Sequence, residues 1–204
     1  MNEKFFNLSE EKRICIINAG YRIFAENSYK KSPVSEIAAE AGISKSLLFH
    51  YFRNKKELYL YLLEYAAEIT FTYLNDYRCY EEEDIFEIML RGLTAKINMM
   101  KKYPDITRFT LRAYYETDAE VADEIKALIG RTASYGANSS KLKLDPTQFK
   151  DGLDLEMMYN DMYFASEGYL WENTRSGIID VDKAEQDFRR MINFWKSLYL
   201  KPQK

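Results

Sequence analysis

Histidine is nearly absent from this chain, and cysteine, proline and glycine are scarce. The 204 residues include one histidine, two cysteines, four prolines and eight glycines. So few helix-breaking residues favour long uninterrupted helices. One histidine excludes a His-based catalytic triad elsewhere in the chain, and two distant cysteines exclude a disulfide framework or a cysteine-rich zinc site. We therefore expect a protein that is not an enzyme and holds no metal or cofactor, with Cys15 in the core and Cys79 in an exposed polar break.

The chain also lacks an apolar segment long enough for a signal peptide or a membrane helix. The richest stretch, "LYLYLLEYAAEITFTYL", is interrupted by Glu64 and Glu68. Hydrophobic residues make up 47% of the chain and charged residues 30%, which is typical of a globular protein. We therefore expect a folded protein in the cytoplasm, without a membrane partner.

Apolar residues recur at helical spacing along almost the whole chain, and no alternating pattern typical of strands appears. Capping residues indicate where helices begin. We expect an all-α fold of about nine helices, with a loop at residues 134–146. The expected helix starts are Ser9, Ser32 with Pro33 in the first turn, Ser44, Lys55, Ile85, Asp105, Thr117, Asp145, Leu155 and Asp182.

Charge is distributed unevenly along this chain of net charge -3. Residues 1–56 contain ten Lys or Arg against six Asp or Glu, a net of +4, and the remainder contains 19 against 26, a net of -7. A basic N-terminal quarter on an acidic body is typical of a polyanion-binding end. A chance fluctuation of this size is equally compatible with the composition.

The basic residues gather in "AGISKSLLFHYFRNKKEL", which contains the single histidine. Gly42 can end one helix in the left-handed conformation, and Ser44 can cap the next at once. This junction predicts a helix-turn-helix, whose second helix would bury Leu48 and Phe52 and lie in the major groove. A plain antiparallel helix pair with solvated lysines is the alternative. The expected outer face comprises Lys45, Ser46, Phe49, His50 and Arg53.

The stretch "SPVSEIAAEAGISKSLLFHYFRNKKEL" closely resembles the signature of the TetR family of transcriptional regulators. Three positions depart from that pattern: Ser46 where glycine is frequent, Leu47 for a common threonine and Phe49 for a common tyrosine. The resemblance implies an N-terminal helix-turn-helix domain, residues 1–54, that binds operator DNA. The expected DNA-contacting residues are Ser32, Ser44, Lys45, Ser46, Phe49, His50, Tyr51 and Lys55.

The resemblance also implies a C-terminal helical domain, residues 55–204, that binds a small-molecule effector and dimerises. Aromatic and methionine side chains suit an apolar cavity, although most such residues at helical spacing belong to the core. Glu116 or Glu167, if turned inward, would favour a cationic effector. The expected ligand-binding residues are Phe71, Met100, Phe109, Tyr114, Met158, Met162 and Trp171.

The last two long helices are more apolar than one small domain needs, which predicts a homodimer through a four-helix bundle. The expected function is that of a ligand-responsive repressor, released from its operator by a small, largely apolar effector. The alternative is a helical binding or adaptor protein without a specific DNA role. The expected interface residues are Tyr169, Leu170, Phe188, Ile192 and Trp195.

Overall fold

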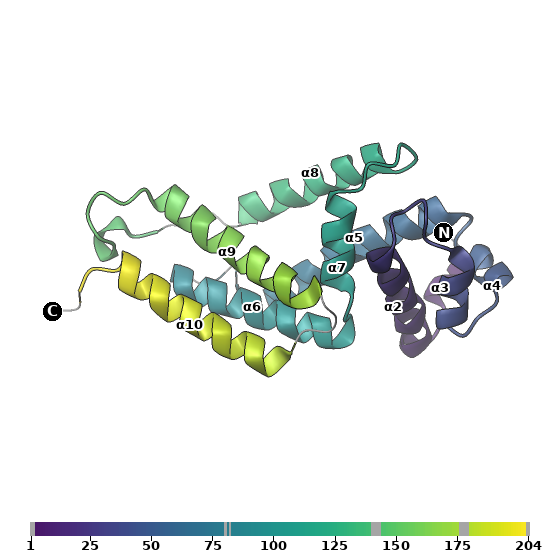
Figure 1. The fold of residues 1–204 in the computed structure, drawn as a ribbon, viewed down its shortest axis with the longest axis horizontal. Coiled ribbons are helices and arrows are strands. Elements are labelled where there is room, and N and C mark those ends of the chain that lie inside the picture. Colours follow the sequence, from purple (N-terminus) through teal and green to yellow (C-terminus); the bar gives the residue numbers. More distant parts are fainter. Residues whose placement is uncertain (1–2, 80, 82, 140–143, 176–179, 203–204) are drawn as a thin grey trace. The chain divides into compact units, whose positions relative to one another are not determined.

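The computed structural model describes residues 3–79, 81, 83–139, 144–175 and 180–202, and the described residues form ten α-helices and one short 3-10 helix without extended strands. The all-α prediction is confirmed. The described chain forms two compact units, the first unit of Met1–Ile69 with Met100–Tyr135 and the second unit of Thr70–Met99 with Gly136–Lys204. The helices (Figure 1) are α1 (Glu3–Phe6), α2 (Glu10–Glu26), α3 (Val34–Glu40), α4 (Lys45–Tyr51), α5 (Lys55–Asp76), α6 (Ile85–Lys102), α7 (Ile106–Tyr114), α8 (Ala122–Ser139), η1 (Pro146–Gln148), α9 (Leu155–Arg175) and α10 (Val181–Tyr199).

An aromatic cluster forms the centre of the first unit, where α2, α5 and α7 meet. The Phe109 ring lies 5.1 Å from that of Tyr21 and 5.2 Å from that of Tyr59, measured between centroids. Phe24 meets Tyr59 edge to face at 4.8 Å. The Tyr21 hydroxyl donates to the carbonyl of Leu62 at 3.1 Å, and burial raises its pKa well above the usual value. These rings and this hydrogen bond hold α2 and α5 together in the first unit.

A glycine allows the same two helices to approach closely. A Cβ atom on Gly20 of α2 would lie 2.5 Å from Cδ1 of Leu62 on α5. Leu62 is fully buried, so its displacement would disturb the side chains packed around it. The close approach of α2 and α5 therefore favours a residue without a side chain at position 20.

The second unit contains α6, α9, α10 and the end of α5. Lys96 on α6 forms an ion pair with Glu167 on α9. The Tyr169 hydroxyl on α9 donates to Asp187 on α10 at 3.0 Å. Lys196 of α10 lies 5.5 Å from the centre of the Phe86 ring on α6. These contacts place α9 and α10 against α6, as the ribbon in Figure 1 also shows.

Several predicted helix starts are confirmed, and others are wrong. The Ser9 hydroxyl accepts from the Lys12 amide at 3.4 Å, and α6 begins at the predicted Ile85. Ser32 does not cap α3, because its hydroxyl donates to the carbonyl of Ser28 at 2.9 Å and Pro33 is the residue that precedes the helix.

The helix predicted from Thr117 begins later in the chain, and the helix predicted from Asp182 begins slightly earlier. Helix α8 begins only at Ala122, and α10 is capped by Asp180, which accepts from the Lys183 amide at 3.0 Å. Residues 134–139 of the predicted loop continue α8, residues 140–143 lie outside the described part, and Asp145 introduces only a 3-10 turn.

The predicted boundary at residue 54 differs from the division into compact units. The first fifteen residues of α5, up to Ile69, pack with the first unit, as do α7 and most of α8.

The cysteine predictions are reversed: Cys15 is exposed and Cys79 is buried, and burial raises the pKa of the Cys79 thiol. Helical periodicity predicts which face of a helix is apolar, but it does not predict which other segment packs against each residue, such as Cys15 or Cys79.

Candidate nucleic-acid interface

Helices α3 and α4 are joined by a tight glycine turn. Gly42 has a φ of 65°, a conformation that residues with a Cβ atom rarely adopt. The amides of Gly42 and Ile43 donate to the carbonyls of Ala39 and Ala38 at 3.0 and 2.9 Å, which completes a Schellman motif. The Ser44 hydroxyl then accepts from the Leu47 amide at 3.1 Å and caps α4. This local chemistry builds the predicted helix-turn-helix.

Helix α4 has one buried and one exposed face. Leu48 and Phe52 are 0% and 1% exposed, as predicted. The buried ring of Phe5, from α1, lies 4.9 Å from Phe52 and 5.9 Å from Tyr51. The sequence did not predict α1, although an apolar pair just before the first capping serine was a visible signal. Phe5 of this pair contributes to holding α4 in place.

The exposed face of α4 gathers the predicted polar and aromatic residues. Lys45, Ser46, Phe49 and His50 are all exposed. The Lys45 amine lies 5.8 Å from the centre of the Phe49 ring, and the hydroxyls of Ser44 and Ser46 are 3.0 Å apart. Such a face offers cationic and neutral donors for phosphates and base edges, and a flat ring for thymine methyls.

Three of the predicted DNA-contacting side chains are instead occupied inside the first unit. Ser32 is 2% exposed, and Tyr51 is 8% exposed against Phe5. The Lys55 amine donates to the carbonyls of Tyr29 and Lys30 at 2.9 and 3.2 Å. The side chains of Ser32, Tyr51 and Lys55 therefore contribute to holding the helix-turn-helix together, and their assignment as DNA contacts stays a prediction.

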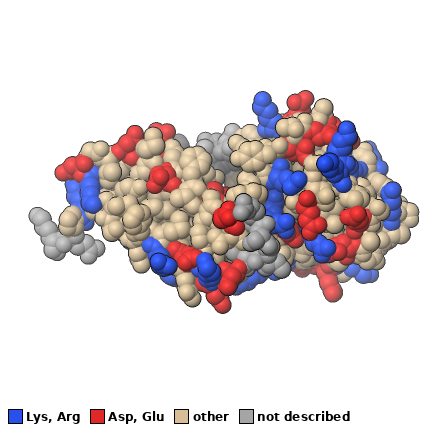
Figure 2. All heavy atoms as spheres, viewed as in Figure 1, with Lys and Arg blue, Asp and Glu red and all other residues tan. Residues whose placement is uncertain are grey.

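The charge around α4 is less one-sided than the sequence indicated. The face of the first unit drawn in Figure 2 carries Lys and Arg interspersed with Asp and Glu. Some of the counted cations are paired: Arg22 meets Glu40 at 2.7 Å and Lys56 meets Glu124 at 2.5 Å. The exposed face of α4 is therefore stronger support for DNA binding than the net charge of residues 1–56.

The predicted ligand-binding residues do not form one cluster within either unit. Met100, Phe109 and Tyr114 belong to the first unit, and the others to the second. Met100, Phe109, Met158 and Met162 are buried and Phe71 is half-buried, whereas Tyr114 is 60% and Trp171 39% exposed.

Glu116 and Glu167 both use their carboxylates within their own units. Glu116 accepts from the Tyr29 amide at 2.7 Å. Glu167 pairs with Lys96; burial lowers the pKa of Lys96, but the carboxylate outweighs burial and the net pKa is raised. Because both carboxylates already have partners in their own units, neither glutamate favours a cationic effector as strongly as predicted.

The predicted interface residues lie inside the second unit. Leu170, Phe188, Ile192 and Trp195 are 2 to 5% exposed, and Tyr169 is half-buried. The exposed large apolar residues of α9 and α10 are different ones, and Figure 2 shows few charged side chains over α9. The predicted interface set therefore stays a prediction, and it differs from the exposed apolar set. The exposed set comprises Met157, Tyr163, Phe164, Trp171, Phe194 and Leu198.

In the described part of the chain, no group of three or more His, Cys, Asp or Glu side chains is arranged to hold a metal ion. None of the described helices combines the length and apolar character that crossing a membrane requires.

Comparisons with known proteins agree with this architecture. The sequence model described as "Bacterial regulatory proteins, tetR family" matches residues 16–62. The fatty acid metabolism regulator protein of Bacillus subtilis (strain 168) is 38% identical over 53 residues, which is 26% of this chain and 27% of that protein. An uncharacterized HTH-type transcriptional regulator of the same organism is 40% identical over 63 residues, 31% of this chain and 22% of that protein. The chain thus spans about a quarter of the length of the curated relatives it matches.

Two solved structures cover almost the whole chain. A TetR family transcriptional regulator from Chloroflexus aurantiacus J-10-FL has a TM-score of 0.62 and 21% identity, covering 98% of this chain and 99% of that one. A ketosteroid transcriptional regulator of Mycobacterium tuberculosis has a TM-score of 0.68 and 16% identity, covering 92% of this chain and 94% of that one. At these identities the likeness concerns the fold.

Proposed function

Because the chain belongs to the TetR family of transcriptional regulators, we propose that it binds double-stranded operator DNA through α4 and represses transcription in the cytoplasm. The observation that carries this proposal is the exposed face of Lys45, Ser46, Phe49 and His50 on a helix whose opposite face is buried. Side chains held on a rigid helix reach base edges at fixed spacing.

The alternative of an adaptor without a DNA role makes a different prediction for a salt series. A regulator retains preference for one sequence as salt rises, whereas an adaptor shows at most weak binding that salt abolishes. The sequence preferred by the protein can be selected from random duplexes and then titrated at several salt concentrations. Loss of all preference would favour the adaptor.

A matched pair of lysine variants tests the role of α4. Lys45→Ala should weaken operator binding and lower the slope of log affinity against log salt by about 0.9 if one phosphate contact is lost. Lys126→Ala, an exposed lysine on α8, removes the same charge outside the helix-turn-helix. Equal affinities and slopes for the two variants would exclude α4 as the DNA-binding helix.

We infer that the protein forms a homodimer through the exposed apolar residues of α9 and α10. Met157, Phe164 and Trp171 are spaced seven residues apart and therefore share one side of α9. Their exposed fractions are 65%, 68% and 39%, a large uncovered apolar stripe for a monomer. Phe194 and Leu198, four apart on α10, are 59% and 41% exposed. Two copies of this helix pair would bury the stripe as a four-helix bundle.

We further infer that a small, largely apolar effector releases the DNA. Relatives named for fatty acid metabolism and for ketosteroid regulation support an apolar ligand, as do the buried methionines 158 and 162 of the second unit. Helix α5 is continuous from Lys55 to Asp76 and contributes to both units, so it can transmit a displacement. Operator half-sites are spaced by about 34–36 Å, so a small change in the distance between two α4 helices would prevent simultaneous docking.

This effector proposal is tested by reciprocal titration. Fatty acids and steroids are screened by thermal shift, and a stabilising compound is titrated with and without operator DNA. Operator should weaken effector binding by the same factor by which the effector weakens operator binding. Equal effector affinity in both titrations would show that the two ligands are not coupled.

A further inference from the structure

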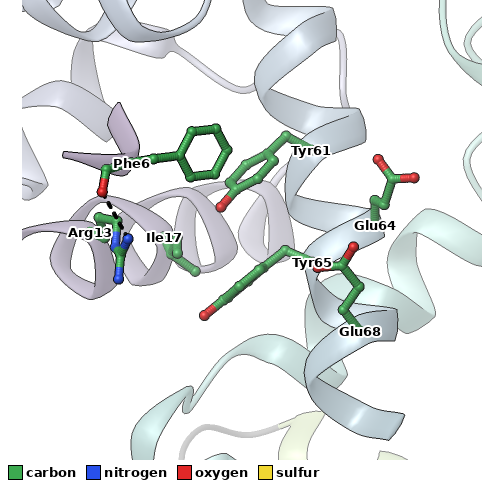
Figure 3. A pocket seen from close by; sticks show the side chains of 7 residues that line it. All are labelled: Phe6, Arg13, Ile17, Tyr61, Glu64, Tyr65 and Glu68. Atoms are coloured by element: carbon green, nitrogen blue, oxygen red, sulfur yellow. Dashed lines mark hydrogen bonds between the residues drawn. The ribbon is translucent and has the colours of Figure 1, made fainter. Parts of the chain in front are cut away.

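A cavity of about 330 Å³ lies in the first unit, between α1, α2 and α5. Its volume is at the lower end of the range for small-molecule sites, about 300–1,000 Å³. Figure 3 shows tyrosine rings from α5 facing the side where α1 and α2 contribute Phe6 and Arg13. None of the predicted ligand-binding residues lines it. The lining residues are Phe6, Arg13, Ile17, Tyr61, Glu64, Tyr65 and Glu68.

One face of α5 supplies both rings and carboxylates to this cavity. Tyr61, Glu64, Tyr65 and Glu68 are spaced three, four and seven residues from the first, which places them along one side of a helix. The two tyrosine rings stack, with centroids 5.8 Å apart and planes 21° apart. The Tyr65 hydroxyl is hydrogen-bonded to that of Tyr103 at 3.0 Å. The rings therefore form a fixed aromatic wall with carboxylates on the same helical face.

The charges of the cavity are separated along its length. Its lining holds two glutamates and one arginine, a net charge of -1. The Arg13 guanidinium donates to the carbonyl of Phe6 at 3.0 Å, which ties it to the α1 end. In Figure 3 Glu64 and Glu68 lie toward the opposite end, beyond the tyrosine rings. A ligand would thus meet aromatic faces in the middle and negative charge at one end.

We propose that this cavity binds a small organic cation, an ammonium group attached to a flat apolar body. A cation near the face of a tyrosine ring is attracted by the ring quadrupole. An ammonium donates charge-assisted hydrogen bonds to carboxylates. The flat body would lie against the exposed sides of Tyr61 and Phe6, whose rings meet edge to face at 6.4 Å. The Phe6 side chain is 48% exposed. An anion would instead face two carboxylates.

Residues that line the cavity contact the residue that packs against the end of α4. Phe6 and Tyr61 line the cavity, and the ring of Phe5 lies 5.5 Å from that of Tyr61. Phe5 packs against Phe52, the residue that ends α4. A ligand that displaces Phe6 or Tyr61 would therefore shift the packing beneath α4 and change its affinity for DNA. This coupling rests on the proposed DNA-binding function, whereas the binding site itself does not.

Calorimetric titration of the full chain at neutral pH tests the site directly. The probes are phenethylamine, which is protonated, phenethyl alcohol as a neutral isostere and 3-phenylpropionate as an anion. We expect only the amine to bind. The double variant Glu64→Gln/Glu68→Gln should weaken its binding by at least about tenfold, whereas Glu11→Gln/Glu36→Gln, with the same charge change outside the cavity, should not.

Three results would overturn the proposed binding site. The first is that phenethylamine does not bind at concentrations up to about 10 mM, which would detect even weak binding. The others are that phenethyl alcohol binds equally well, or that Glu64→Gln/Glu68→Gln leaves the affinity for the amine unchanged. A second titration of operator DNA with and without phenethylamine tests the coupling. If the amine binds but the DNA affinity is unchanged, the coupling is rejected and the site stands. A chain that binds no DNA would remove the proposed function without altering the calorimetric result.

Discussion

Replacing Lys55 by alanine should destabilise the fold while leaving DNA contacts intact. The Lys55 amine donates to the carbonyls of Tyr29 and Lys30 at 2.9 and 3.2 Å and lies 4.6 Å from the centre of the Tyr29 ring. A third carbonyl, that of Ser32, is 3.5 Å away. These contacts join the start of α5 to the turn that precedes α3. An ammonium group whose three N–H groups point at backbone carbonyls has no further N–H group to donate to a phosphate.

The magnitude follows from these contacts. Hydrogen bonds to charged groups stabilise by about 1.5–3 kcal/mol each, and an exposed cation–π contact by about 0.5–1 kcal/mol. The side chain is half-buried, and water can replace the lysine at the exposed Lys30 carbonyl, so each contact is worth less than its full value. We expect Lys55→Ala to lower the free energy of unfolding by about 2 kcal/mol, a fall in melting temperature of about 4–8 °C for a chain of this length.

Lys55→Ala and Lys45→Ala are compared in one experiment with two readouts. Urea unfolding should show a loss for the residue 55 variant and almost none for the residue 45 variant, whose side chain is exposed. The salt slope of DNA binding should change in the opposite order, falling by about 0.9 for residue 45 only. If Lys55→Ala unfolds like the unmodified protein and its salt slope falls instead, Lys55 is a phosphate contact and does not stabilise the fold.

Three further predictions concern other parts of the molecule. Ser44→Ala removes the cap of α4 and should lower stability by about 1 kcal/mol, measured by urea unfolding, with Ser44→Asp restoring most of it; no loss would mean that the cap is unimportant. Glu167→Gln leaves Lys96, whose side chain is 28% exposed, without its counter-charge and should lower the free energy of unfolding by about 1–2 kcal/mol. Because the pair raises the pKa of Lys96, its stabilisation is present below the ordinary lysine pKa and is lost as pH rises through the raised value. The unfolding curves of the unmodified protein and of Glu167→Gln should therefore coincide in strong alkali and differ at lower pH. Phe164→Glu, on the exposed side of α9, should convert the dimer to a monomer in sedimentation, whereas Lys126→Ala should not; a dimer that persists would place the interface elsewhere.

Local features of the sequence were sufficient for much of the fold. The glycine turn at Gly42, the Ser44 cap and the start of α6 were predicted because each depends on residues within one or two turns of a helix. The exposed face of α4 followed from helical periodicity. The resemblance to a known family supplied the expected function, because its signature lies in this contiguous segment.

Only the tertiary structure decided what each helical face touches. Helix α9 is apolar on more than one side, and packing buried Met158 and Met162 while it left Phe164 exposed, which a periodic pattern cannot distinguish. The amine of Lys55 found its partners 25 and 26 residues earlier in the chain. The cavity beside α5 likewise needs Phe6, Arg13 and Tyr61 together, which come from three helices. The physical reason is the same in each case. These contacts join segments that are far apart in sequence, and the spacing of residues within one helix does not predict which distant segment packs against it.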